Sequence, residues 1–424
     1  MRQRTSDPLS PSLPTSRRAF LIGSSAAALG ALAARSPWVF AQPASNEELW
    51  RSVRAQFTFT DAIVPMNAAN LCPSFEAVAR RVAALTGDID RDCSSNNRAK
   101  FAALLEDARN AVAQQLQVSA EEVALVRNTS EANNIINNGL ELQPDDEVVI
   151  WDQNHPTNNV AWEVRAQRFG LSVVKVATPT NPSSQQELID AFVAKLTPRT
   201  RVLAITHVSN VSGIKLPVKE ITAAARARGI YVHLDGAQSW GAMAVDLNDL
   251  DVDSYSASSH KWYMGPKEVG LLVVRERNIE RIWPSVVAPG WGDTSETTLK
   301  GARKFESLGQ RDDAALAGLG LAAEIHETIG ARNIENRVVM LAQTLKEQIV
   351  AAGNQLVTPL QPELSSGVCI TAAPSGQGGQ LVNALYANFG IAGAASGGIR
   401  LCPHVYNILE HVERAAAGVN SLLA

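Results

Sequence analysis

The sequence predicts an α/β fold in which a mostly parallel sheet forms a large domain and a smaller α+β domain follows. Short apolar runs alternate with helical stretches through the middle of the chain. This alternation is typical of crossover connections in a buried parallel sheet. After Pro289 a polar segment precedes long helical stretches and a single expected strand. The 424 residues, 46% of them hydrophobic, are enough for two or three domains of roughly 150 residues each.

Apolar runs with many β-branched residues are the expected strands of the large domain. They lie at residues 122–128, 147–152, 172–177, 201–208, 230–235, 254–259 and 269–274. The expected helices among them are 97–116, 130–142, 158–169, 186–196 and 218–228. The smaller domain is expected to hold one long helix (314–352), a strand (367–373) and two further helices. Sheets of this kind bind ligands at the carboxyl ends of their strands.

The N-terminal segment differs in composition from the rest of the chain. Arg17 and Arg18 stand directly before an apolar stretch at 19–34, which is short for a membrane span of about 20 residues. Small residues up to Ala41 suit cleavage, and the segment resembles a twin-arginine export signal. The resemblance implies a periplasmic protein; an amphipathic or disordered leader and an uncleaved membrane tether are the alternatives. The expected parts are the signal (1–42), the large domain (43–289), whose first residues can pack on the small domain, and the small domain (290–424).

Charge and cysteine usage exclude several classes of protein. The net charge of −4 argues against nucleic-acid binding, which needs a basic face. The four cysteines form no CxxC motif, so neither a zinc ribbon nor a redox pair is expected. His233 and Asp235 lie two residues apart on one strand, but no third ligand follows at a metal-like spacing, and His326 lacks the second histidine of HExxH. No metal site is predicted.

Two charged residues at strand ends carry the strongest chemical signal. Lys261 lies between two expected strands, where an amine is costly to bury without a function. Such a lysine loses its proton readily and forms Schiff bases with carbonyl compounds. Asp235 ends another expected strand, and a carboxylate there can keep a pyridinium nitrogen protonated. A solvated loop lysine and a helix-capping aspartate are the structural alternatives.

These residues and their surroundings resemble the class V aminotransferase family of pyridoxal-phosphate enzymes over roughly residues 60–415. The resemblance implies the fold type I transferase fold, pyridoxal 5'-phosphate as cofactor, and a homodimer with active sites near its interface. It makes Lys261, Asp235 and His155 catalytic, with the imidazole of His155 stacked on the pyridine ring. The cofactor-binding residues that it implies are Thr129, Ser130, His155, Asn210, Asp235, Gln238, Ser258, His260, Lys261 and Gln310.

The substrate carboxylate has its own expected partners. The segment from Gly397 to Asn407 resembles the family's carboxylate-binding segment, which makes Arg400 a bidentate clamp for the carboxylate. Asn67, in an early loop, is the expected second contact. A helix N-cap at Thr129, a turn histidine at His155 and a surface arginine at Arg400 are the structural alternatives.

Two departures from the family pattern bear on function. Residues 390–398 contain no cysteine, although desulfurases carry one shortly before the carboxylate-binding arginine. Cys402 lies two residues after Arg400 and Cys369 lies in an expected strand, so persulfide chemistry is disfavoured. Gln310 stands where relatives carry a threonine that reaches the phosphate in the neighbouring subunit.

The leading hypothesis is an exported pyridoxal-phosphate enzyme that acts on an amino acid or an amino-acid-derived substrate. Epimerisation, transamination and elimination share this constellation, and an isopenicillin N epimerase-like enzyme is favoured. Alternatives are a cysteine desulfurase or selenocysteine lyase, a periplasmic enzyme that tailors a siderophore, and a binding protein without chemistry. A nicotinamide-dependent oxidoreductase is disfavoured because GxGxxG does not follow the first strand.

Overall fold

The computed structural model describes residues 46–288, 291 and 299–424 of the chain. The expected export signal at residues 1–42 and the expected boundary between residues 289 and 290 lie outside the described residues. Within these ranges, no helix is both long and apolar enough to cross a membrane.

A seven-stranded sheet lies at the centre of the large part of the protein, in the order β2-β8-β7-β6-β5-β3-β4. Strand β8 runs antiparallel to both of its neighbours, and the other neighbouring strands are parallel. The mostly parallel sheet predicted from the sequence is therefore present. The strands are β2 (Val123–Val126), β3 (Glu147–Trp151), β4 (Ser172–Val176), β5 (Thr200–Thr206), β6 (Tyr231–Asp235), β7 (Ser254–Ser258) and β8 (Gly270–Val274).

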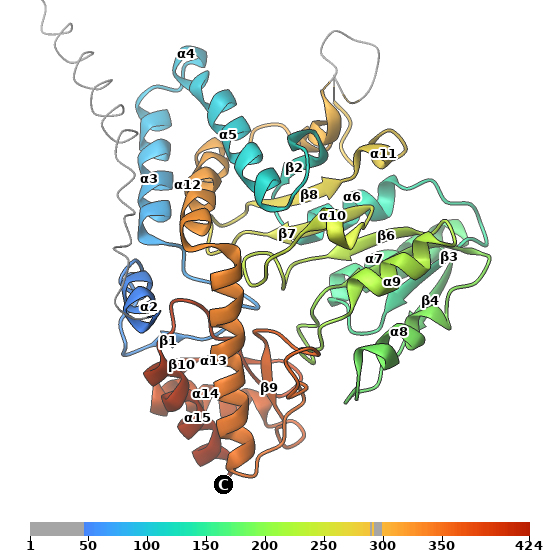
Figure 1. Cartoon of the computed structure of the whole chain (residues 1–424). Helices are drawn as coiled ribbons and strands as arrows, with labels where there is room; N and C mark the ends of the chain where they lie inside the picture. The colour runs from blue at the N-terminus through green and yellow to red at the C-terminus, as the bar shows by residue number, and fades with distance from the viewer. Residues whose placement is uncertain (1–45, 289–290, 292–298) are drawn as a thin grey trace, which may run out of the picture. The chain divides into compact units, whose positions relative to one another are not determined.

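Helices cover both faces of this sheet. Figure 1 shows α8 and α9 on the nearer side and α6 behind, and α6 packs against α7 while α8 packs against α9. Every residue of β3, β6, β7 and β8 is buried, as expected where both faces are covered. Polar groups that follow these strands are thereby directed to the carboxyl edge of the sheet. The helices are α6 (Thr129–Gly139), α7 (Pro156–Phe169), α8 (Gln185–Val193) and α9 (Val218–Arg226).

A helical layer beside β2 combines segments that are far apart in the sequence. Helix α12 (Asp313–Ile329) packs on α3 (Glu76–Arg91) and on α5 (Lys100–Gln115). The prediction of a single helix over residues 314–352 is wrong. Helix α12 ends at Ile329, and a second helix, α13 (Ala331–Ala351), begins after Gly330. The φ angle of Gly330 is +88°, which glycine adopts readily and other residues do not.

The C-terminal part contains two small sheets. In the first, β12 (Ile399–Leu401) pairs antiparallel with both β9 (Cys369–Thr371) and β11 (Ala394–Ala395). In the second, β1 (Val64–Pro65), from the N-terminal region, pairs parallel with β10 (Ile391–Ala392). The early loop that contains Asn67 is thereby attached to the C-terminal part of the chain.

The remaining elements are short or lie at the periphery. The helices are α2 (Asn46–Arg54), α4 (Ser95–Arg98), α10 (Leu247–Leu250), α11 (Glu276–Ile279), α14 (Gly378–Phe389) and α15 (Leu409–Leu423). Two 3-10 turns, η1 (Ala120–Glu122) and η2 (Gly301–Glu306), complete the set of described elements.

Candidate active site

A cavity of about 220 Å³ opens at the carboxyl edge of the central sheet. Its walls come from the segments that follow β2, β3, β5, β6 and β7, which is where ligands bind in such sheets. All of the expected cofactor-binding residues except Gln310 line it: Thr129, Ser130, His155, Asn210, Asp235, Gln238, Ser258, His260 and Lys261.

One end of the cavity is formed by the first turn of α6. The backbone N–H and the hydroxyl of Thr129 both bond to the hydroxyl of Ser258, at 2.8 and 2.7 Å, so these two expected phosphate ligands form one unit. The side chain of Asn128 caps the helix by accepting the N–H of Glu131 at 3.0 Å. The N–H of Ser130 has no acceptor among the described residues. A helix N-terminus with an open N–H group favours an anion such as phosphate.

Asp235 ends β6 and lines the same cavity. Its carboxylate accepts the side-chain amide of Asn133 at 2.9 Å and the backbone N–H of Ala237 at 3.0 Å. Only 2% of Asp235 is exposed, yet no cation lies within ion-pair distance of it in the described part of the chain. A buried carboxylate without a cation is costly, so this position suits a ligand group that carries a proton.

Lys261 follows β7 and directs its amine into the cavity. Burial lowers the pKa of this amine below its ordinary value; the charge of Asp235 opposes the shift and that of Arg400 adds to it. The amine makes neither a hydrogen bond nor an ion pair with any other described side chain. A lysine with a lowered pKa and a free amine is a suitable nucleophile and proton carrier.

His155 stands at the N-terminus of α7, and its ring nitrogen Nδ1 accepts the backbone N–H of Thr157 at 3.3 Å. Burial, followed by the charge of Lys261, lowers the pKa of His155, so the imidazole is neutral and carries its proton on Nε2. His260 is similar, because burial and the charge of Lys261 lower its pKa to about 4. Both histidines therefore enter the cavity as neutral rings.

Two amide side chains complete the wall beside Lys261. Gln238 donates to the carbonyl of Ala69 at 3.0 Å and accepts the indole N–H of Trp262 at 2.7 Å, which leaves one amide hydrogen for the cavity. The backbone carbonyl of Asn210 accepts a guanidinium hydrogen of Arg400 at 3.0 Å.

The two residues expected to bind a carboxylate are in direct contact. Arg400, on β12, donates to the side-chain oxygen of Asn67 at 3.1 Å. A parallel β-bridge between the backbones of Asn67 and Cys402 holds the loop beside this strand. Arg400 is only 5% exposed, its Nε has no partner, and no carboxylate in the described residues pairs with it. Such a charge is costly to bury, so the site is built to receive an anion.

Gln310 lies outside this cavity. It is exposed, and its amide donates to the carbonyl of its neighbour Arg311 at 2.9 Å. Within a single subunit, Gln310 therefore does not contribute to the cavity that the other expected residues line.

The cavity also contains residues that the sequence analysis does not identify, among them Asn133, Thr157 and Thr206. The hydroxyl of Thr206 is buried and has no hydrogen-bond partner in the part of the chain that the structure describes. For Asn133 a signal is present in the sequence, because two consecutive asparagines in a helix interior are unfavourable unless they bond to something. Asn133 also follows Thr129 by one helical turn, which places both on the same face of α6.

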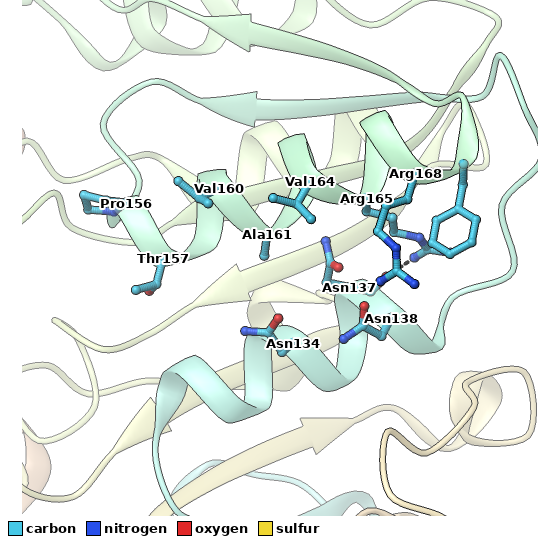
Figure 2. A pocket seen from close by; sticks show the side chains of 11 residues that line it. Asn134, Asn137, Asn138, Pro156, Thr157, Val160, Ala161, Val164, Arg165 and Arg168 are labelled. Carbon is cyan, nitrogen blue, oxygen red and sulfur yellow. Dashed lines mark hydrogen bonds between the residues drawn. The ribbon is translucent and has the colours of Figure 1, made fainter.

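A second, wider hollow of about 530 Å³ lies between α6 and α7, and Thr157 lines both spaces. Figure 2 shows Val160 and Val164 along α7 with Asn134 and Asn138 on the facing helix. Lys261, Asp235 and His155 are not among the residues that line this hollow. No cluster of three or more potential metal ligands is found in the described ranges either.

Comparison with known proteins decides the family. The aminotransferase class-V profile matches residues 76–412, most of the chain. The chain belongs to the class V aminotransferase family. Its cofactor is therefore pyridoxal phosphate, and its fold is the fold type I of pyridoxal-phosphate enzymes.

Individual proteins resemble nearly the whole chain. An isopenicillin N epimerase from Streptomyces clavuligerus is 27% identical over 391 residues, which cover 88% of this chain and 98% of that protein. The cysteine desulfurase CsdA from Escherichia coli superposes with a TM-score of 0.77 at 25% identity, covering 88% of this chain and 98% of that one. A variant of C-DES with glycine covalently linked to its pyridoxal-phosphate cofactor superposes with a TM-score of 0.78 at 21% identity, covering 87% and 98%.

The residues of the cavity fit this cofactor. The open N–H of Ser130 suits its phosphate, the unpaired amine of Lys261 suits its aldehyde, and Asp235 suits its ring nitrogen. Thr206, whose buried hydroxyl has no partner among the described residues, also lines this cavity.

Proposed function

We propose that this protein is an exported enzyme that changes bonds at the α-carbon of an amino acid or an amino-acid-derived substrate, in the manner of an isopenicillin N epimerase. The observation that carries the proposal is the buried guanidinium of Arg400, which has no carboxylate partner among the described residues and lies beside the same cavity as the amine of Lys261. Together they suit a substrate with one carboxylate and one reactive carbon.

Each residue then has a role that follows from its surroundings. Pyridoxal phosphate, when bound, supplies an electron-withdrawing ring that stabilises negative charge at the substrate α-carbon. Thr129, Ser130, Ser258 and His260 hold the phosphate, and Asp235 keeps a proton on the ring nitrogen. Arg400 and Asn67 orient the carboxylate. Lys261, with its lowered pKa, would remove the proton from one face of the α-carbon, and epimerisation is complete when a proton is delivered to the opposite face.

Other residues of the cavity exclude solvent and fix the ring. The neutral His155 would cover one face of the ring, and Asn210 and Gln238 line the same cavity. A neutral imidazole suits stacking on a positively charged ring better than an imidazolium does, because like charges repel. Burial and the neighbouring Lys261, which lower the pKa of His155, favour that state.

Cysteine desulfurase activity is the second candidate, favoured by the likeness to CsdA. Against it, none of the four cysteines lines the cavity. Burial raises the pKa of Cys72 and of Cys369 to about 12, and Cys402 is buried as well. A sulfur acceptor must reach the substrate as a thiolate, which these thiols do not readily form. The remaining thiol, Cys93, is exposed at the end of α3.

The experiment follows the α-proton of candidate substrates. Residues 43–424 are purified with pyridoxal phosphate and incubated with a panel of amino acids and siderophore peptides in deuterium oxide. Exchange of the α-proton with formation of the opposite epimer supports the proposal, a keto acid indicates transamination, and sulfide from cysteine indicates a desulfurase. A protein that binds no cofactor and exchanges no proton contradicts the proposal. A Lys261→Ala variant, which should bind the cofactor without a covalent bond, is the control.

We further propose a homodimer in which the exposed apolar side of α7 is covered by a second copy. Val160, Val164 and Phe169 are each about half exposed on this helix, and the hollow beside them shares Thr157 with the cavity. Covering such a stripe removes apolar area from water. Export is proposed from the N-terminal sequence, in which Arg17 and Arg18 precede the apolar stretch at 19–34 and small residues up to Ala41 suit cleavage. An Arg17→Lys, Arg18→Lys variant that still reaches the periplasm contradicts it.

A further inference from the structure

We propose that Asn133 is a positioning residue that holds the carboxylate of Asp235 in the direction of the cofactor ring nitrogen. The inference rests on the proposed function of the cavity. A chain of hydrogen-bonded side chains runs from Ser254 through His233 and Asn133 to Asp235. The distances are 2.7 Å between Ser254 Oγ and His233 Nδ1, 2.9 Å between His233 Nε2 and Asn133 Oδ1, and 2.9 Å between Asn133 Nδ2 and Asp235 Oδ2.

The direction of every bond in this chain is determined. A carboxylate only accepts, so Asn133 must present its amide hydrogens to Asp235. The opposite atom, Asn133 Oδ1, accepts the hydroxyl of Ser256 at 2.5 Å as well as the proton on His233 Nε2. His233 Nδ1 is therefore the acceptor of the Ser254 hydroxyl. Because two donors hold Oδ1, the amide cannot turn over.

Burial makes the arrangement rigid. His233 and Ser256 are fully buried, and Asn133 and Ser254 are nearly so. Burial lowers the pKa of His233 to about 3, so its ring is neutral. The negative charge within this series of hydrogen-bonded side chains therefore lies on the carboxylate of Asp235. A buried side chain that is held by several hydrogen bonds, as Asn133 is by His233, Ser256 and Asp235, keeps one geometry.

The helix that carries Asn133 also forms the phosphate end of the cavity. Thr129 begins α6 and bonds to Ser258, and Asn133 stands one turn further along the same helix. One rigid element thus holds the phosphate with its first turn and, through Asp235, the ring nitrogen with its second. The backbone N–H of Ala237 supplies the other bond to Asp235.

The test replaces Asn133 by aspartate, which has the same shape but no amide hydrogens. Two carboxylates at this separation share a proton, so Asp235 no longer offers a fully charged acceptor to the ring. We expect the Asn133→Asp variant to bind pyridoxal phosphate roughly tenfold to hundredfold more weakly. In the variant loaded with cofactor labelled with ¹⁵N in the ring, the nitrogen resonance should move toward that of a neutral pyridine. Asn248→Asp, an exposed site on α10 with the same chemical change, should match the wild type.

A second pair of variants decides the matter if Asn133→Asp does not fold. His233→Gln keeps an N–H donor for Asn133 Oδ1 and should stay within about twofold of wild-type affinity, whereas His233→Phe removes the donor and should lose about threefold to tenfold. Wild-type protein that takes up no cofactor overturns the proposed function together with this inference. Wild-type protein that binds cofactor, while His233→Phe and any folded Asn133→Asp retain its affinity and resonance, overturns this inference alone.

Discussion

Replacing Arg400 by methionine separates a ligand-binding role from a structural one. Its guanidinium makes two hydrogen bonds, to the carbonyl of Asn210 and to the side chain of Asn67, and pairs with no carboxylate among the described residues. Losing two bonds to neutral acceptors costs about 2 kcal/mol in the free energy of unfolding. Removing a buried charge without a partner returns several kcal/mol. The cofactor-free variant should therefore be at least as stable as the wild type.

Catalysis should change far more than stability. A substrate carboxylate that loses a buried cation loses about 2–5 kcal/mol of binding free energy, so kcat/KM should fall between roughly 30-fold and several thousand-fold. The exchange of the substrate α-proton measures kcat/KM, and urea unfolding of the cofactor-free protein measures stability. Arg332→Met is the matched control, because Arg332 is exposed and pairs with Glu335 across one helical turn. A variant that loses more than about 3 kcal/mol of stability while keeping kcat/KM within threefold would refute the reasoning.

Three further predictions follow from the burial or exposure of individual side chains. Iodoacetamide should modify Cys93 in the native protein but spare Cys72 and Cys369, whose pKa burial raises to about 12; mass spectrometry showing rapid modification of either buried thiol would contradict this. Burial lowers the pKa of His404 from 6.5 to about 3, so the unfolded chain binds a proton that the folded chain refuses, and stability falls as the pH drops below 6.5. His404→Asn should reduce the loss between pH 7 and pH 5 by about 2 kcal/mol in urea titrations, and an unchanged pH slope would count against it. Val164→Glu, on the half-exposed side of α7, should convert the proposed dimer to monomers in sedimentation experiments, with a dimer at unchanged affinity as the opposing result.

The strands of the sheet could be read from the sequence because they are buried on both faces. Such strands are apolar runs bounded by polar residues, and the expected run at 147–152 corresponds to β3 (Glu147–Trp151). The break between α12 and α13 could not be read, because the helical pattern continues on both sides of Gly330. What separates the two helices is packing, since α12 contacts α3 and α5 whereas α13 contacts α15.

The sequence by itself indicated the family and the cofactor through its resemblance to class V aminotransferases. It also predicted that Lys261 and Asp235 lie close together, because residues that follow neighbouring parallel strands meet at one edge of a sheet. Only the tertiary structure decided which side chains support them. The contact between Asn133 and Asp235 joins a helix to a strand about a hundred positions away, at an Oδ2–Nδ2 distance of 2.9 Å. The bond between Arg400 and Asn67 likewise joins opposite ends of the chain. No local sequence pattern predicts these hydrogen bonds, because they form where elements that are distant in the sequence pack together.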